Sequence, residues 1–268
     1  MRFKKDLFGL FCFITILGLS DISPAGNLPS DTLRSAISGK KLKRGEKMVY
    51  SIEWKGAGIT FIKAGTSFMR VDSELTWARD RRAYHIVNET WSNPTFSFFY
   101  KVHDRIESFV DHEKLYSLRY QKILNEGGYH HQESVEFDQE KGKAVYSTGQ
   151  TVDLFPEAKD ILISLYWARL FPLEVGKSIY IDNHTDKKNY PLEVKVYKKE
   201  KIKTIFGKVE CLMVEPVLRT PGLFENKGRL LVWLTNDERK IPVLMKSKIL
   251  IGSINAVLKE YNPGITEK

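Results

Sequence analysis

Apolar and polar residues alternate along most of the chain with a period of two. Between residues 101 and 110, Val102, Ile106 and Val110 fall on one side of the alternation, while lysine, histidine, arginine and glutamate fall on the other. This pattern predicts antiparallel strands with one buried and one solvated face. Turn residues recur about every 10 to 12 positions, a spacing typical of all-β sheets, sandwiches and barrels.

The stretch from 229 to 250 predicts a β-hairpin. Residues 230–235, LLVWLT, are apolar on both faces, as in a strand that is covered on both sides. Polar residues follow and predict a turn, and residues 243–249 predict a return strand with one solvated face. Pro242 has no backbone N–H, so it fits only the start of that strand. We expect Trp233 to be buried and paired with the return strand.

One segment departs from this pattern. After Ala158-Lys159-Asp160, apolar residues follow one another at helical spacing until Pro172. This predicts one main helix over Asp160–Phe171, with Ile161, Leu165 and Ala168 in its apolar stripe. The predicted fold is mostly β: a single antiparallel sheet, strongly curved or nearly closed into a half-barrel, with the helix packed over its concave face.

The N-terminus is typical of a secretory signal peptide. Three basic residues precede an apolar run from Leu7 to Ser20, and Ser23-Pro24-Ala25 matches a cleavage site. The run is shorter than the roughly 20 residues that a spanning helix needs, so we expect a periplasmic protein that is peripheral to the membrane at most. The expected organisation is a signal peptide (1–25), a flexible leader (26–44), a single β domain (45–262) and a tail (263–268).

Charge and cysteine content limit the possible partners of the protein and its disulfide bonds. The net charge is +9, and removal of residues 1–25 lowers it only to +8, because three basic and two acidic residues are lost. Lysines cluster at 40–47 and 195–203, where they either protect solvated sheet edges or face an anionic envelope component. We expect no nucleic-acid partner. Cys211 is the one cysteine left after cleavage, so the mature chain forms no internal disulfide.

No catalytic motif is found in the sequence. Of the sequence His130-His131-Gln132-Glu133, only His131 and Glu133 can share a face of a strand, and two ligands do not make a closed metal site. Cys211 alternates with Val209 and Met213, which is typical of a buried, inert thiol. No nucleophile elbow is present. We predict a protein that is not an enzyme, with no catalytic residues, no metal and no cofactor.

The large aromatic residues are the remaining feature of the sequence that bears on function. They either fill the core or line a cavity for an apolar ligand, as pockets are mostly apolar with a few polar groups. The candidate ligand-lining residues are Trp54, Phe61, Trp91, Phe99, Ile161, Leu165 and Trp233.

Four stretches carry a resemblance to a known family. They are GEKMVYSIEWKG, SNPTFSFFYKVHDRIESFVD, DILISLYWARLFPLEVG and the long segment from VEPVLRTPGLF to NAVLKEY. With them, nearly all of the chain after the leader resembles the bacterial exported proteins of the DUF3108 family, whose function is unknown. More weakly, the tryptophan strand, its Asn/Asp turn and the proline-started strand resemble a hairpin of periplasmic lipoprotein carriers, which implies a curved sheet that cups acyl chains.

Two functions follow as hypotheses. The first is that the protein binds or carries a hydrophobic ligand, a lipid or a lipoprotein acyl chain, in an apolar groove under the helix. The alternative is a structural or assembly factor of the cell envelope, with a filled core and a basic face that binds a partner.

Overall fold

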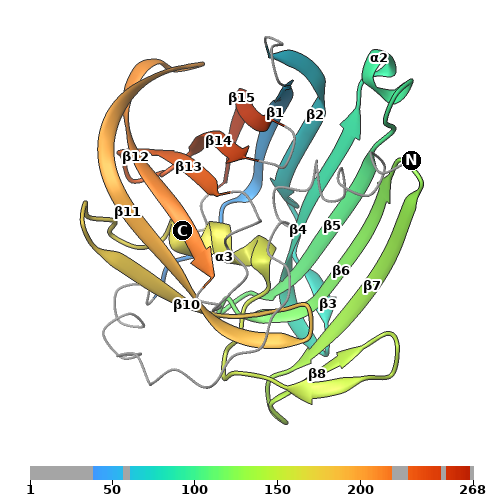
Figure 1. The fold of residues 1–268 in the computed structure, drawn as a ribbon. Coiled ribbons are helices and arrows are strands. Elements are labelled where there is room, and N and C mark those ends of the chain that lie inside the picture. The colour runs from blue at the N-terminus through green and yellow to red at the C-terminus, as the bar shows by residue number, and fades with distance from the viewer. Residues whose placement is uncertain (1–38, 57–60, 219–228, 249–251, 266–268) are drawn as a thin grey trace.

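The computed structural model describes residues 39–56, 61–218, 229–248 and 252–265, most of which lie in strands (Figure 1). The strands are β1 (Arg44–Lys55), β2 (Ile62–Val71), β3 (Thr76–Ala78), β4 (Arg81–Ser92), β5 (His103–Asp111), β6 (Ser117–Glu126), β7 (Tyr129–Asp138), β8 (Lys143–Tyr146), β9 (Thr151–Asp153), β10 (Ser178–Thr185), β11 (Lys188–Thr204), β12 (Gly207–Leu218), β13 (Leu230–Thr235), β14 (Pro242–Lys248) and β15 (Ser253–Ile265). Within these ranges there are two short helices, α2 (Pro94–Ser97) and α3 (Ile161–Ala168).

All of the described strands belong to one antiparallel sheet. Its order is β10-β11-β12-β13-β14-β15-β1-β2-β4-β5-β6-β7-β8-β9, and β3 pairs with β4 beside this path. The edge strands are β10 and β9, so the ladder of backbone hydrogen bonds does not close into a barrel. The sheet curls until its two halves surround α3 (Figure 1). The predicted fold class, a mostly β half-barrel with one main helix inside the curve, is confirmed.

Side chains connect the two ends of the sheet where the ladder stops. The Tyr146 hydroxyl on β8 lies 2.8 Å from Nε2 of His184 on β10, and the backbone N–H of Lys187 donates to the same hydroxyl at 2.7 Å. Nearby, the Asn189 side chain on β11 donates to the carbonyl of Asp153 on β9 at 2.7 Å. The half-barrel is therefore nearly closed, with a seam held by side chains.

The core lies on the concave face, as the alternation predicts. Val102, Ile106 and Val110 are all buried. The outer face of the same region is polar: Arg105 forms ion pairs with Glu89 at 3.1 Å and with Glu107 at 2.7 Å. The period of two therefore separates a buried apolar face from a solvated charged one.

The positions of the two helices distinguish the two ends of strands β1, β2 and β4 to β7. Helix α2 follows the last residue of β4, beside the end of β1 and the start of β2, and we call this the α2 end (Figure 1). Helix α3 lies inside the curve toward the other end, which we call the α3 end. There its C-terminal Arg169 reaches Glu46, near the start of β1.

The predicted hairpin is formed by β13 and β14. Trp233 is buried and pairs with Leu244, and Pro242 is the first residue of β14, as expected for a residue without a backbone N–H. The last residue of the predicted return strand, residue 249, lies outside the described residues.

The helices differ in detail from the prediction. Asp160 is the N-cap of α3, and the helix ends at Ala168, before Phe171. Helix α2 was not predicted, because four residues are too few to show a helical period. Asn93 caps it by accepting a hydrogen bond from the backbone N–H of Phe96 at 2.8 Å.

The edges of the folded unit also differ from the expected boundaries at 44 and 262. The predicted signal peptide and most of the predicted leader lie outside the described residues. Leu42 is nevertheless buried in the core, and Lys41 Nζ donates to the His112 carbonyl at 2.9 Å. At the other end, β15 continues to Ile265. Residues 41 and 42 therefore contact the folded unit, and residues 263–265 extend the pairing of β15 with β1.

Candidate functional site: an apolar pocket between the helix and the sheet

Helix α3 is fixed to the sheet at its N-terminus by Asp160. This buried carboxylate accepts hydrogen bonds from the hydroxyls of Ser108 on β5 at 2.5 Å and Ser117 on β6 at 2.6 Å. It also accepts from the backbone N–H groups of Leu162 at 2.9 Å and Ile163 at 3.1 Å, which are otherwise unpaired at the first turn. Burial raises the pKa of Asp160, and these four donors oppose that shift.

The C-terminal side of α3 is fixed by a buried ion pair. The Arg169 guanidinium donates to both carboxylate oxygens of Glu46, at 2.9 and 2.7 Å, and Tyr261 donates to the same carboxylate at 3.0 Å. Arg169 also donates to the Lys240 carbonyl at 3.0 Å, in the turn between β13 and β14. Burial works against the charge of Arg169, but Glu46 outweighs it, so the pKa of the guanidinium is raised.

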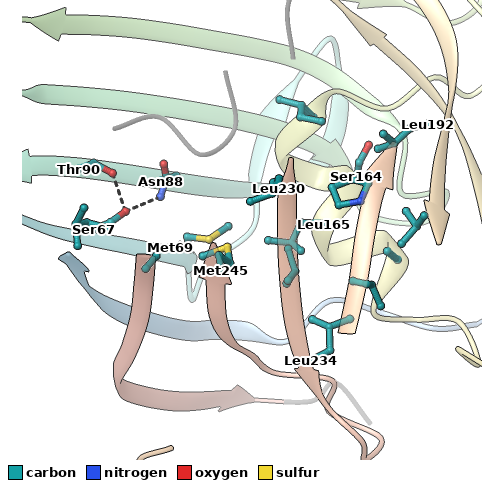
Figure 2. Close-up of a pocket in the computed structure, with 18 residues that line it drawn as sticks. Ser67, Met69, Asn88, Thr90, Ser164, Leu165, Leu192, Leu230, Leu234 and Met245 are labelled. Atoms are coloured by element: carbon teal, nitrogen blue, oxygen red, sulfur yellow. Dashed lines mark hydrogen bonds between the residues drawn. The ribbon is translucent and has the colours of Figure 1, made fainter. Parts of the chain in front are cut away.

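A pocket lies between α3 and the concave face of the sheet (Figure 2). Its wall comes from α3, from β1, β2 and β4 on one side, and from β11 to β15 on the other. The residues that line it are Ile52, Ser67, Met69, Asn88, Thr90, Ile161, Ser164, Leu165, Ala168, Leu192, Val194, Val214, Pro216, Leu230, Val232, Leu234, Met245 and Ala256. None of these residues is charged. Leu165, Pro216 and Leu230 are half-buried and form the part of the wall that the protein covers least.

One corner of the pocket is polar. Ser67 Oγ accepts a hydrogen bond from Thr90 Oγ1 at 2.7 Å and another from Asn88 Nδ2 at 3.0 Å, as the dashed lines in Figure 2 show. Asn88 Nδ2 also donates to the carbonyl of Phe68 at 3.0 Å. A hydroxyl has two acceptor sites and one hydrogen, so the Ser67 hydrogen remains as a donor and Asn88 Oδ1 remains as an acceptor. Both are neutral groups.

The size and lining of the pocket determine what it can bind. The volume open to the centre of a water-sized sphere is about 80 Å³, whereas one water needs about 10 to 15 Å³ on this measure. The pocket therefore has room for several methylene groups. Apolar cavities hold water poorly, and the uncharged wall gives an ionised group no counter-charge. The arrangement suits an apolar chain that ends in a neutral hydrogen-bonding group.

A second, smaller cavity lies at the seam between the sheet ends and has a different character. Lys122 Nζ lies 3.3 Å from Asp186 and 3.6 Å from Glu133 at its wall, next to Tyr146 and His184. Burial lowers the pKa of His184. Nδ1 of its neutral ring donates to Asn189 Oδ1 at 2.7 Å, so Nε2 accepts a hydrogen bond from the Tyr146 hydroxyl. The cavity volume is about 10 Å³, which leaves room for about one water. The ionic cluster therefore helps to hold the two ends of the sheet together and leaves no space for a larger ligand.

The candidate groups for metal binding and nucleophilic chemistry are separated from one another. Within the described ranges, no group of three or more His, Cys, Asp or Glu residues could hold a metal ion. His131 stacks on Tyr129 with ring centroids 6.1 Å apart, and His103 pairs with Glu89 at 2.8 Å. Burial raises the pKa of the Cys211 thiol to about 11, which keeps it protonated at neutral pH.

Two of the seven candidate ligand-lining residues lie on the pocket wall. Ile161 and Leu165 are four residues apart on α3 and face the pocket together with Ala168. The helical period that predicted their shared face therefore also placed them at the cavity.

Two tryptophans point away from the pocket. Val232 faces it, so its neighbour Trp233 lies on the outer face, where Nε1 donates to Glu200 at 2.6 Å. Thr90 likewise faces the pocket, and its neighbour Trp91 is partly exposed on the outside. Adjacent residues of a strand face opposite sides of the sheet, and the size of an aromatic ring does not indicate which side it occupies.

The other three aromatic candidates lie toward the α2 end. Trp54 packs edge-on against Phe96, with ring centroids 6.4 Å apart, and it does not line the cavity. Phe61 and Phe99 are exposed. These three residues, like Trp91 and Trp233, do not line the pocket beneath α3.

Sequence reasoning missed the polar corner and most of the apolar wall. A signal for the corner was present: Ser67 is two residues from Met69, and Asn88 is two residues from Ile86, so each polar residue is in phase with buried apolar ones. A polar residue at such a position faces the interior of the sheet. What brings the two residues together is the pairing of β2 with β4, which the strand pattern alone does not specify.

The family comparison matches most of the chain. The family described as "Protein of unknown function (DUF3108)" matches residues 49–259. This confirms the resemblance that the sequence motifs indicated. No curated protein matches this chain.

One solved structure shows the same kind of fold. A β-barrel-like protein of the domain of unknown function DUF1849 from Brucella abortus is 11% identical, with a TM-score of 0.52 over 82% of this chain and 98% of that one. At this identity the likeness shows the fold alone. A protein with a YmcC-like fold from Bacteroides fragilis is 13% identical over 83% of this chain and 97% of that one, with a TM-score of 0.29.

The weaker likeness to lipoprotein carriers is not shown by these comparisons and stays a prediction. In the part of the chain that the structure describes, neither helix is long and apolar enough to span a membrane.

Proposed function

We propose that this chain, which belongs to the DUF3108 family of unknown function, binds the acyl chain of a lipid or lipoprotein in the pocket beneath α3. The observation that carries the proposal is the pocket wall, which is apolar except for Ser164, whose hydroxyl donates to the Asp160 carbonyl, and the corner formed by Ser67, Asn88 and Thr90. Such a lining, with a few polar groups that fix orientation, is typical of sites for hydrophobic ligands. In this role the protein binds or carries its ligand and catalyses no reaction.

The proposal places the protein in the periplasm. Its support is the N-terminal sequence, where basic residues, a short apolar run and Ser23-Pro24-Ala25 match a cleaved signal peptide. Acyl chains of envelope lipids and lipoproteins are available there, and an aqueous compartment between two membranes requires that they be shielded from water in transit.

A second candidate function rests on the lysines of β11. Lys199, Lys201 and Lys203 are exposed at alternate positions of this strand, so they share one face. A basic face of this kind attracts an anionic envelope component, as an assembly or structural factor requires. In that case the pocket beneath α3 has no ligand of its own, and the two functions are separated by a test of the pocket.

The test is a titration with a fluorescent acyl probe whose head group is neutral, such as a labelled monoacylglycerol. Leu165→Trp places a larger side chain at the pocket wall, so it should fill part of the space and weaken probe binding by at least about tenfold. Leu170→Trp is the matched control: Leu170 is also half-buried, lies one residue beyond the α3 C-cap and does not line the pocket.

The control variant should bind the probe like the wild type, and both variants should unfold cooperatively in urea. A wild type that takes up no probe, or two tryptophan variants that lose binding equally, would show that the pocket is not the site and would favour the structural role.

A further inference from the structure

The α2 end carries an exposed aromatic pair. Phe98 and Phe99 follow α2 and are 85% and 80% exposed, and their rings pack edge to face with centroids 5.2 Å apart. The pair therefore forms one apolar projection instead of two separate side chains. An exposed apolar group of this size is unfavourable in water and marks a contact surface.

The start of β2 adds apolar side chains to the same end. Phe61 and Ile62 are exposed. The backbone N–H of Asn93, the N-cap of α2, donates to the carbonyl of Ala64 at 2.9 Å, so the first residues of β2 lie beside the helix. We call Phe61, Ile62, Phe98 and Phe99 the aromatic tip.

The charge around the aromatic tip is basic. Lys63 and Lys101, next to Ile62 and close after Phe99, are both exposed. Lys55 is exposed as well, and its Nζ lies 5.6 Å from the centroid of the Phe61 ring. Residues 90–103 contain no aspartate or glutamate. Glu53, the strand partner of Lys63, is half-buried and lies 3.8 Å from Lys259, which offsets its charge. Apolar rings flanked by lysines match the interface of an anionic bilayer, where the rings enter the headgroup region and the lysines meet the phosphates.

We propose that the aromatic tip docks this protein onto an anionic lipid bilayer. The rings of Phe98 and Phe99 insert at the interface, and Lys63 and Lys101 contact the headgroups. Strands β2 and β4, which lead into the tip, also carry the polar corner of the pocket, so docking brings the bilayer to that side of the site. This inference goes beyond acyl-chain binding and does not depend on it.

Co-sedimentation with lipid vesicles tests the aromatic part of the proposal. The wild type should sediment with vesicles of phosphatidylcholine mixed with phosphatidylglycerol, and weakly with phosphatidylcholine alone. The double variant Phe98→Ser/Phe99→Ser should lose most of this binding. Trp77→Ser is the matched control, because Trp77 is a 67% exposed aromatic on β3, at the other end of β4.

A charge-reversal pair tests the basic part. Each lysine near an anionic surface strengthens binding about fivefold, so Lys63→Glu/Lys101→Glu should weaken binding to the mixed vesicles by at least about tenfold. Lys114→Glu/Lys141→Glu is the control, since these exposed lysines lie in the turns after β5 and β7, away from the α2 end. Added salt should weaken wild-type binding.

The outcomes separate this proposal from the pocket proposal. Leu165→Trp should sediment like the wild type, because docking uses no pocket residue. Wild-type protein that stays in solution with both kinds of vesicle would overturn the docking proposal, and so would a Trp77→Ser variant that loses as much binding as the tip variant.

Discussion

Polar side chains inside the curved sheet differ in what surrounds them and, for acids, in their pKa. Thr90 on β4 points into the pocket, whereas Asp104, its partner on β5, lies buried near Glu126 of β6. Burial and then the negative charge of Glu126 raise the pKa of Asp104 to about 8, and the hydrogen bond from the backbone N–H of Asn125 opposes this shift only in part. At neutral pH this carboxyl therefore retains its proton for most of the time.

A raised pKa in the folded state has a definite effect on stability. Between the unfolded value of 3.8 and about 8, the folded protein holds more protons at this site than the unfolded chain. The contribution of Asp104 to stability is therefore greatest below pH 4 and is lost as the pH rises through 8. Asp104→Asn, which cannot ionise, should gain stability over the wild type between pH 5 and pH 9, on the order of 1 to 3 kcal/mol.

Urea denaturation of both proteins at pH 5, 7 and 9 measures this difference. Asp153→Asn is the control: the hydrogen bond from Lys143 lowers the pKa of Asp153, so its carboxyl is ionised throughout this range and its effect should not change. A constant difference between Asp104→Asn and the wild type across the three pH values would contradict the assignment of a buried, protonated Asp104.

At the scale of elements, α3 is held at both ends while its middle faces the pocket. Asp160 ties its first turn to β5 and β6, and Arg169 ties its end to Glu46 on β1. Anchors at both ends keep the helix at a distance from the sheet that its own side chains do not fill. The pocket is therefore a consequence of where the buried polar groups fix the helix.

Removal of one partner of the buried Arg169–Glu46 ion pair should lower the free energy of unfolding strongly. Glu46→Gln leaves a buried guanidinium without its counter-charge and should cost about 3 to 5 kcal/mol in the free energy of unfolding. The double variant Glu46→Gln/Arg169→Met should cost clearly less than the two single variants added together, because it removes both charges. Urea denaturation of the three variants gives the coupling energy.

A surface pair provides the comparison. Lys177 and Glu174 lie 2.6 Å apart but are both exposed, so Glu174→Gln should change stability by less than about 1 kcal/mol. If Glu46→Gln cost no more than this control, the helix would not be anchored in the way described here.

The strands and the main helix could be predicted from local sequence patterns. The site could not, because it depends on how these elements pack together. Alternation predicted the strands, the helical period predicted α3, and Pro242 predicted where β14 begins. The pair of Glu46 and Arg169 is separated by 123 positions and depends on how the sheet curls, which no local pattern contains. The side of the sheet that Trp91 and Trp233 occupy depends in the same way on which neighbour faces the core.

In the whole molecule, the pocket beneath α3 and the aromatic tip at the α2 end lie along the same strands. The curled sheet positions both: β2 and β4 carry Ser67, Asn88 and Thr90 in their middle and lead to Phe98 and Phe99 beyond their ends. A curved sheet with a single covering helix was predicted from the alternation of the strands and the one helical segment. The seam at Tyr146 and His184 was not, because it joins strands that are not neighbours in the sheet.

The most direct test of the central claim is to ask what the pocket contains when the protein is purified from its native envelope. Organic extraction followed by lipid mass spectrometry should recover about one acyl species per protein molecule from the wild type and from Leu170→Trp, and clearly less from Leu165→Trp, since only Leu165 lines the pocket. Recovery of no acyl species from the wild type, or of equal amounts from all three proteins, would contradict the claim that the pocket beneath α3 holds an acyl chain.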